Sequence, residues 1–144
     1  MVAKTFVDTN VLVYAHDRQA GDRHDAARSR LEQLWETRSG VVSTQVLQEL
    51  YAVVTRKTAV PIPVAGARQI VKDYLAWECV VNDADAIVGA FDYESRYRIS
   101  FWDALIVNAA NAASAEVLLT EDLNPGQRYG SVVVENPFAS LTHR

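Results

Sequence analysis

The sequence has few cysteines, no long apolar runs and no excess of positive charge. Cys79 is the single cysteine among 144 residues, so neither an intramolecular disulfide nor a cysteine-rich zinc site can form. No run reaches the roughly 18–20 apolar residues that a membrane-spanning helix needs. The first ten residues, MVAKTFVDTN, lack the apolar segment of a signal peptide. We therefore expect a cytoplasmic protein with no membrane among its partners.

Basic residues are outnumbered, because 14 Lys and Arg face 18 Asp and Glu and give a formal net charge of −4. The chain lacks the long-range positive field that draws nucleic acid to a basic protein. This charge argues against a protein that coats DNA. It does not exclude an enzyme that meets phosphate groups through bound cations, since such cations do the work of basic side chains.

The sequence does contain a regular alternation of two patterns. Short apolar runs predict buried strands at 4–8, 41–43, 79–82, 116–120 and 131–135, with a polar loop at 121–130. Apolar residues at helical spacing predict helices at 9–17, 22–38, 44–57 and 64–76, one that begins after 82 or 83, and one that begins at 100. Such alternation implies a parallel sheet covered on both faces. We therefore predict a single domain over 1–144, with a three-layer α/β/α fold around a mostly parallel sheet of about five strands.

Four acidic residues adjoin the predicted strands. They lie at the end of the first strand, in the helix after the second, at the start of the helix from 100 and after the fourth strand: Asp8, Glu49, Asp103 and Asp122. Ligands of open α/β sheets bind outside the carboxyl ends of the strands, so these carboxylates are expected to converge there. Carboxylates at close range do not all stay ionised without cations, and oxygen ligands favour Mg²⁺ or Mn²⁺ over zinc. Carboxylates that converge in this way would therefore form a magnesium or manganese site.

Each of these acids also has a purely structural explanation, and position alone does not decide between the two. Asp8 is a favoured residue for capping the helix that follows it. Ser100 and Asp103 have the spacing of a capping box. Glu49 can be a solvated helix acid, and Asp122 precedes an Asn-Pro-Gly turn that accounts for an acid there.

Several segments together resemble a known family. They are FVDTNVLVYA at the start, VVSTQVLQELY in the second strand–helix unit, ISFWDALIVNAA in a later helix, and VLLTEDLNPGQ with VVVENPF near the end. They occur in family order over almost the whole chain. On these segments the chain resembles a PIN domain, and specifically the VapC-type toxins of bacterial toxin–antitoxin pairs. The resemblance implies a compact α/β/α domain, which agrees with the fold predicted from the alternation.

The resemblance also implies an activity. The chain is similar to Mg²⁺- or Mn²⁺-dependent endoribonucleases that cleave RNA with metal-activated water, and a toxin of this type inhibits translation and growth. The catalytic and metal-binding residues that it implies are Asp8, Glu49, Asp103 and Asp122. Glu121 is an alternative to Asp122, but the T-x-D spacing of the family falls on Thr120 and Asp122.

Other candidate side chains lie beside these acids in the sequence, and the resemblance also implies partners. Side chains that could orient the acids or a phosphate are Thr120, Asn10, Thr9 and Ser43, with helix capping as the alternative for the last two. Weaker candidates for contacting RNA, each otherwise a solvated surface charge, are Arg96, Arg98 and Arg128. A homodimer and a small antitoxin of the VapB type are implied, and a basic partner would complement an acidic cleft. Transfer, ribosomal and messenger RNA all stay open as targets.

Two other classes of protein share parts of this pattern. A catalytically inactive PIN-like domain would bind RNA or a partner without cleaving it. A phosphoryl-transfer protein would use Asp8 as a nucleophile, but a haloacid-dehalogenase-type phosphatase has a second Asp where this chain has Asn10. A response-regulator receiver has a lysine after its fifth strand, and SVVVENPF supplies none.

Overall fold

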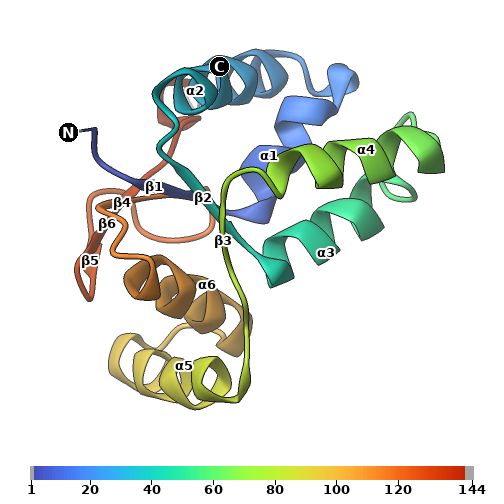
Figure 1. The fold of residues 1–144 in the computed structure, drawn as a ribbon. Coiled ribbons are helices and arrows are strands. Elements are labelled where there is room, and N and C mark those ends of the chain that lie inside the picture. The colour runs from blue at the N-terminus through green and yellow to red at the C-terminus, as the bar shows by residue number, and fades with distance from the viewer. Residues whose placement is uncertain (1, 142–144) are drawn as a thin grey trace.

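The computed structural model describes residues 2–141, in which one sheet lies between layers of helices (Figure 1). The strands are β1 (Thr5–Val7), β2 (Gly40–Ser43), β3 (Glu78–Val80), β4 (Val117–Leu119), β5 (Arg128–Tyr129) and β6 (Val132–Glu135). The helices are α1 (Thr9–His16), α2 (Asp22–Thr37), α3 (Thr44–Val54), α4 (Val64–Tyr74), α5 (Ala84–Tyr97) and α6 (Phe101–Ala112), with 3-10 turns η1 (Arg18–Ala20) and η2 (Ala139–Leu141). The predicted α/β/α fold is confirmed. None of the helices within residues 2–141 is long and apolar enough to cross a membrane.

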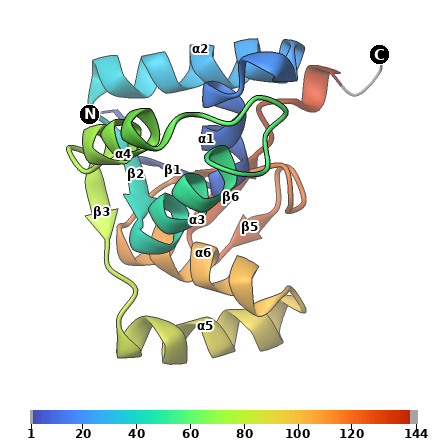
Figure 2. The ribbon, with the colours of Figure 1, turned by 90° about the vertical axis from the view of Figure 1, so that its right-hand side faces the viewer.

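The strand order is β3-β2-β1-β4-β6-β5, and all pairings are parallel except that of β5 with β6. The chain runs outward from β1 through β2 to β3 and then returns to β4 on the other side of β1. Because parallel crossovers are right-handed, the helices of the outward path and of the return cover opposite faces. Accordingly α1 and α2 lie over one face, while α6 covers the other with α5 packed outside it (Figure 2). The order therefore reverses between β1 and β4, the kind of position where open α/β sheets bind ligands.

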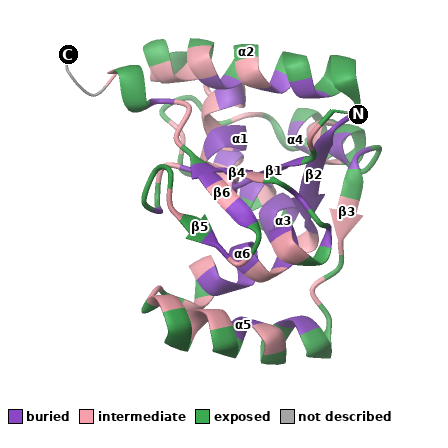
Figure 3. Cartoon of the chain, turned by 90° about the vertical axis from the view of Figure 1, so that its left-hand side faces the viewer, coloured by how far each residue is buried: buried purple, intermediate pink, exposed green. Residues whose placement is uncertain are grey.

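The core fills the spaces between the sheet and the helices on both of its faces. Phe6 and Val7 of the central strand β1, Leu12 of α1, Val107 of α6 and Leu118 of β4 are all fully buried. Each such side chain contributes about 1.5–3 kcal/mol when it leaves water. Buried residues accordingly gather on the sheet and on the helix sides that face it, whereas the outer sides of α2 and α5 are exposed (Figure 3). This packing holds the carboxyl ends of β1 and β4 in fixed positions.

The sheet has one strand more than the five predicted. The additional strand, β5, lies in the segment 121–130 that was predicted to be a loop. It pairs antiparallel with β6 across a tight turn in which Gly130 has a φ of 62°, a left-handed conformation that glycine adopts without steric cost. A strand of two residues among polar neighbours carries no periodic signal, so the pattern could not reveal it.

Candidate active site

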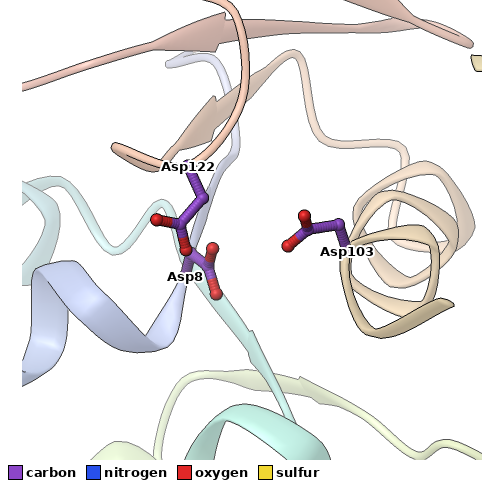
Figure 4. Close-up of side chains that lie close together, drawn as sticks. All are labelled: Asp8, Asp103 and Asp122. Carbon is purple, nitrogen blue, oxygen red and sulfur yellow. The ribbon is translucent and has the colours of Figure 1, made fainter. Parts of the chain in front are cut away.

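Three of the four predicted acids meet beyond the carboxyl ends of β1 and β4. Asp8 directly follows β1, Asp103 lies in the first turn of α6, and Asp122 lies in the loop after β4. One carboxylate oxygen from each lies within 4.8 Å of those of the other two. Figure 4 shows the three carboxylates turned toward a common space. The expected convergence at the reversal of strand order is therefore observed for these three.

Asp8 both caps a helix and belongs to this acidic cluster. The residue is only 6% exposed. Its Oδ1 accepts the backbone N–H of Thr9 at 2.7 Å, which is the N-cap contact of α1. Its Oδ2 accepts the hydroxyl of Thr120 at 2.8 Å. The two explanations that the sequence left open for Asp8 are thus compatible in one side chain.

Asp103 is positioned by the start of α6. The Ser100 hydroxyl oxygen caps the helix by accepting the Asp103 N–H at 3.1 Å. This contact uses the backbone of Asp103 and leaves its half-buried carboxylate directed at Asp8 and Asp122 (Figure 4). A carboxylate in the first turn also interacts favourably with the helix dipole. The first turn of α6 therefore places the Asp103 carboxylate beside the other two acids.

Two polar side chains connect the acids on either side of the strand reversal. The Thr120 hydroxyl donates to Asp8 and accepts the N–H of Asp122 at 3.1 Å. The Asn10 amide donates to Asp122 Oδ2 at 3.0 Å and to Thr120 Oγ1 at 3.3 Å. Its own Oδ1 is buried and accepts no hydrogen bond from the described residues. The predicted supporting residues Thr120 and Asn10 therefore lie within the cluster, with one oxygen acceptor unused.

Glu49 and Glu121 lie outside this set of three. Glu49 is exposed on α3, where its Oε1 accepts the hydroxyl of Thr9 at 3.0 Å, and it lines the same cavity. Glu121 instead turns away, since its Oε1 accepts the Tyr14 hydroxyl at 2.9 Å and its Oε2 lies 3.4 Å from Arg23 Nε. The structure thus brings Asp122, and not its neighbour Glu121, to the other acids.

The remaining candidates lie away from the carboxylates. Ser43 is fully buried, and its hydroxyl oxygen accepts the Val46 N–H as the cap of α3, which is the structural alternative for this residue. Arg96 forms an ion pair within α5, Arg98 ends that helix, and Arg128 donates to a carbonyl of its own hairpin. None of these three arginines is among the described residues that line the acid cavity. An RNA-binding role for them stays a prediction.

The three acids form a cluster of negative charge with no cationic side chain paired to it among residues 2–141. Burial raises the pKa of Asp8 to about 7, although hydrogen bonds from Thr120 and Thr9 favour the charged form and partly oppose the shift. The charges of Asp122 and Asp103 raise this pKa further. Burial also raises the pKa of Asp103, and Asp122 adds to that shift. Across residues 2–141, none of the ion pairs involves these three acids.

The acids lie in a cavity of about 480 Å³ that also has an apolar wall. Twelve residues line it: Asp8, Thr9, Asn10, Val13, Tyr14, Gln45, Glu49, Val53, Trp102, Asp103, Ile106 and Asp122. No Lys, Arg or His is among these residues. A polyanion that enters this cavity therefore meets carboxylates and apolar groups, with no basic side chain on its lining to receive it.

Gln45 and Trp102 line this cavity and were not predicted from the sequence. The buried Gln45 amide donates to the Trp102 carbonyl at 3.5 Å, and its Oε1 accepts the Asn82 side chain at 3.3 Å. A signal existed for both residues. Gln45 is four positions before Glu49 and so shares its helix face, and Trp102 directly precedes Asp103.

The chain belongs to the PIN domain family, which matches residues 5–129. Its fold resembles the sarcin–ricin-loop-cleaving toxin VapC20 of Mycobacterium tuberculosis, with a TM-score of 0.62 and 20% identity over 80% of this chain and 87% of that one. It also resembles VapBC2 of Rickettsia felis, bound to a DNA fragment from its promoter, with a TM-score of 0.64 and 22% identity over 92% of this chain and 97% of that one. DNA-bound VapBC of Salmonella typhimurium is similar as well, with a TM-score of 0.66 and 17% identity over 94% of this chain and 99% of that one. No curated protein matches the sequence significantly.

Proposed function

We propose that this chain is a Mg²⁺- or Mn²⁺-dependent endoribonuclease, and that it is the toxin of a toxin–antitoxin pair that inhibits translation and growth. The observation that carries the proposal is the meeting of three carboxylates, from three separate segments, in a cavity whose described lining contains no cation. Membership of the PIN family supports it, and so does the likeness of the fold to VapC toxins.

The cluster fits a divalent ion of the hard type. One carboxylate oxygen from each of the three acids lies within 4.8 Å of the other two, so rotation of these side chains would bring all three to one ion. The chemistry of the donors also fits, because all are oxygens and the site offers neither sulfur nor imidazole. We propose Asp8, Asp103 and Asp122 as ligands, with Glu49 as a fourth across the cavity.

The residues around the acids act by holding them. When bound, Mg²⁺ or Mn²⁺ would lower the pKa of a water molecule that attacks the phosphodiester and would neutralise charge on the phosphate. Thr120 fixes the Asp8 carboxylate and the backbone at Asp122 through one hydroxyl, so the ligands from β1 and β4 keep a constant separation. Asn10 restrains the Asp122 side chain in the same way. Both residues would act as positioning residues in the proposed reaction.

The partners belong to the same proposal. A small antitoxin of the VapB type would neutralise the toxin, and the toxin itself would form a homodimer. Support comes from the structural neighbours described as VapBC assemblies. An acidic cavity without basic lining residues is also electrostatically complementary to a basic partner segment.

Cleavage of RNA by the purified protein, with Mg²⁺ or Mn²⁺ added, tests the proposed activity. We expect wild type to cut and Asp103→Asn to cut at least about 100-fold more slowly, because metal ligation contributes several kcal/mol to such a transition state. Asp103 suits the test, since the backbone N–H that donates to the Ser100 cap of α6 is retained in Asp103→Asn, so the fold should stay intact. The matched control is Glu32→Gln on α2, which removes one carboxylate charge outside the cavity. If wild type cuts with neither ion, or Asp103→Asn cuts equally well, the chain is not a metal-dependent nuclease of this kind.

A further inference from the structure

The acid cavity has two walls of different chemistry, and the proposed function uses only one of them. The carboxylates form one side, and the other side consists of aliphatic and aromatic side chains: Val13, Tyr14, Val53, Trp102 and Ile106. Trp102 is 64% exposed, an unusual state for the residue with the largest apolar side chain. An exposed tryptophan on the wall of a polar cavity needs an explanation beyond packing.

Trp102 begins a row of aromatic rings that leads away from the acids. The ring of Phe101 lies 5.5 Å from that of Trp102, and the ring of Phe91 on α5 lies 5.8 Å from that of Phe101. Phe91 is itself 49% exposed. The hydrogen bond from Gln45 to the Trp102 carbonyl ties the backbone at this position to α3. The three rings therefore form a continuous aromatic surface that starts beside Asp103.

An RNA strand carries phosphates on one side and bases on the other. The carboxylate wall of the cavity, with its cation, matches the phosphates, and the aromatic wall matches the bases. A phosphate belongs beside the carboxylates and their cation. Because no basic side chain is among the described residues that line the cavity, ionic contacts with the backbone cannot supply the remaining affinity there. Aromatic faces stack on unpaired bases of any sequence, and this is the usual way in which proteins hold single-stranded RNA. A base held in a duplex has no free face to offer.

We propose that Trp102 stacks on an unpaired nucleobase next to the scissile phosphate, with Phe101 and Phe91 extending the platform to the neighbouring nucleotide. Loss of the Trp102 ring should therefore weaken the binding of unpaired RNA and leave that of duplex RNA unchanged. This proposal rests on the proposed nuclease function, because that function places the scissile phosphate beside Asp103.

The steady-state kinetics of two variants at one position test this proposal. Trp102→Ala should raise KM for unpaired RNA about tenfold and leave kcat within about twofold, since stacking holds substrate and transition state alike. Trp102→Phe keeps an aromatic face and should restore most of the affinity. Neither variant should change Mn²⁺ affinity, and the Ala variant should behave as wild type on fully duplexed RNA. Trp35→Phe is the control, because Trp35 is also exposed but lies on α2, outside the acid cavity.

Three results would overturn the stacking proposal: an unchanged KM for Trp102→Ala, an equal loss on duplex RNA, or a loss that tracks a change of oligomeric state in size-exclusion chromatography. The last result would identify the aromatic row as a self-association surface. Failure of the nuclease function looks different, since wild type then cuts no RNA. Stacking is still measured in that case by quenching of tryptophan fluorescence with a single-stranded oligoribonucleotide. A quench that persists in Trp35→Phe and disappears in Trp102→Phe supports stacking, and a quench that persists in Trp102→Phe excludes it.

Discussion

The two ends of α1 each line a cavity, and the two cavities differ in how their charges are partnered. The one at the carboxyl end, between α2 and α4, is the larger, about 680 Å³ against about 480 Å³ for the acid cavity. Its charged side chains balance in number, with Asp17 and Glu32 against Arg18 and Arg28. His16 Nε2 lies 2.8 Å from the Tyr74 hydroxyl, and Arg28 Nε lies 3.2 Å from Glu32 Oε1. At the amino end, four carboxylates line a cavity whose described lining has no cation. Unbalanced charge, and not volume, therefore distinguishes the candidate active site.

The same contrast recurs between two adjacent residues. Glu121 has partners in Arg23 and Tyr14, so its charge is balanced within the protein. Asp122, one position later, faces Asp8 and Asp103 and receives hydrogen bonds only from neutral groups. A carboxylate with a cationic partner in the protein stabilises the fold, whereas a carboxylate without such a partner can bind a metal ion.

The largest expected effect is on the stability of the metal-free protein. The pKa of Asp8 rises from 3.8 to about 7 on folding, so between these values the folded state holds a proton that the unfolded chain releases. Stability should therefore fall as pH rises from about 4 to 7. The shift corresponds to at most about 4 kcal/mol. Asp8→Asn removes the cost of ionising a buried carboxyl. The amide has only one oxygen, however, so it cannot accept hydrogen bonds from both Thr9 and Thr120, and this loss costs about 1 kcal/mol. In EDTA at pH 8 the variant should thus be more stable than wild type by about 3 kcal/mol.

Urea denaturation of both proteins at pH 4 and pH 8 measures this difference. The advantage of Asp8→Asn should vanish at pH 4, where the Asp8 carboxyl of the folded protein already holds its proton. Glu32→Gln, from the larger cavity, should stay within about 0.5 kcal/mol of wild type at both pH values. A variant that is less stable than wild type at pH 8 would show that the Asp8 charge is balanced after all, and the contrast between the cavities would be lost.

Sequence reasoning succeeded where the signal was local. The apolar runs around β1 and β4 predict buried strands, and the rule for strand ends then places Asp8 and Asp122 at one edge of the sheet. It could not choose physically between Glu121 and Asp122, since the choice depends on Arg23, which α2 brings from nearly a hundred positions away. Trp102 and Gln45 were missed for a similar reason, because they come into contact only when α3 and α6 meet over the end of the sheet.

A smaller effect is expected from Mn²⁺ binding, and it separates the two adjacent acids. At a Mn²⁺ concentration of 100 times Kd, the ion should stabilise wild type by about 2.7 kcal/mol. Asp122→Asn should lose most of this gain, because one of the three converging carboxylates is gone. Glu121→Gln should keep it within about 0.5 kcal/mol, since Glu121 faces Arg23. Thermal denaturation with and without Mn²⁺ gives both values. Equal losses in the two variants would mean that both acids reach the ion.

The smallest expected effect concerns the ion pair that lines the larger cavity. Arg28 and Glu32 are both exposed and are spaced i, i+4 on α2, so their coupling should be about 0.3–0.5 kcal/mol. A double-mutant cycle with Arg28→Gln and Glu32→Gln, read by urea denaturation, gives this number. The coupling should shrink in 1 M salt, where the Debye length is about 3 Å. A coupling above about 1 kcal/mol that persists in 1 M salt would mean that the larger cavity also holds strongly interacting charges. The pairing of charges would then no longer distinguish the larger cavity from the acid cavity.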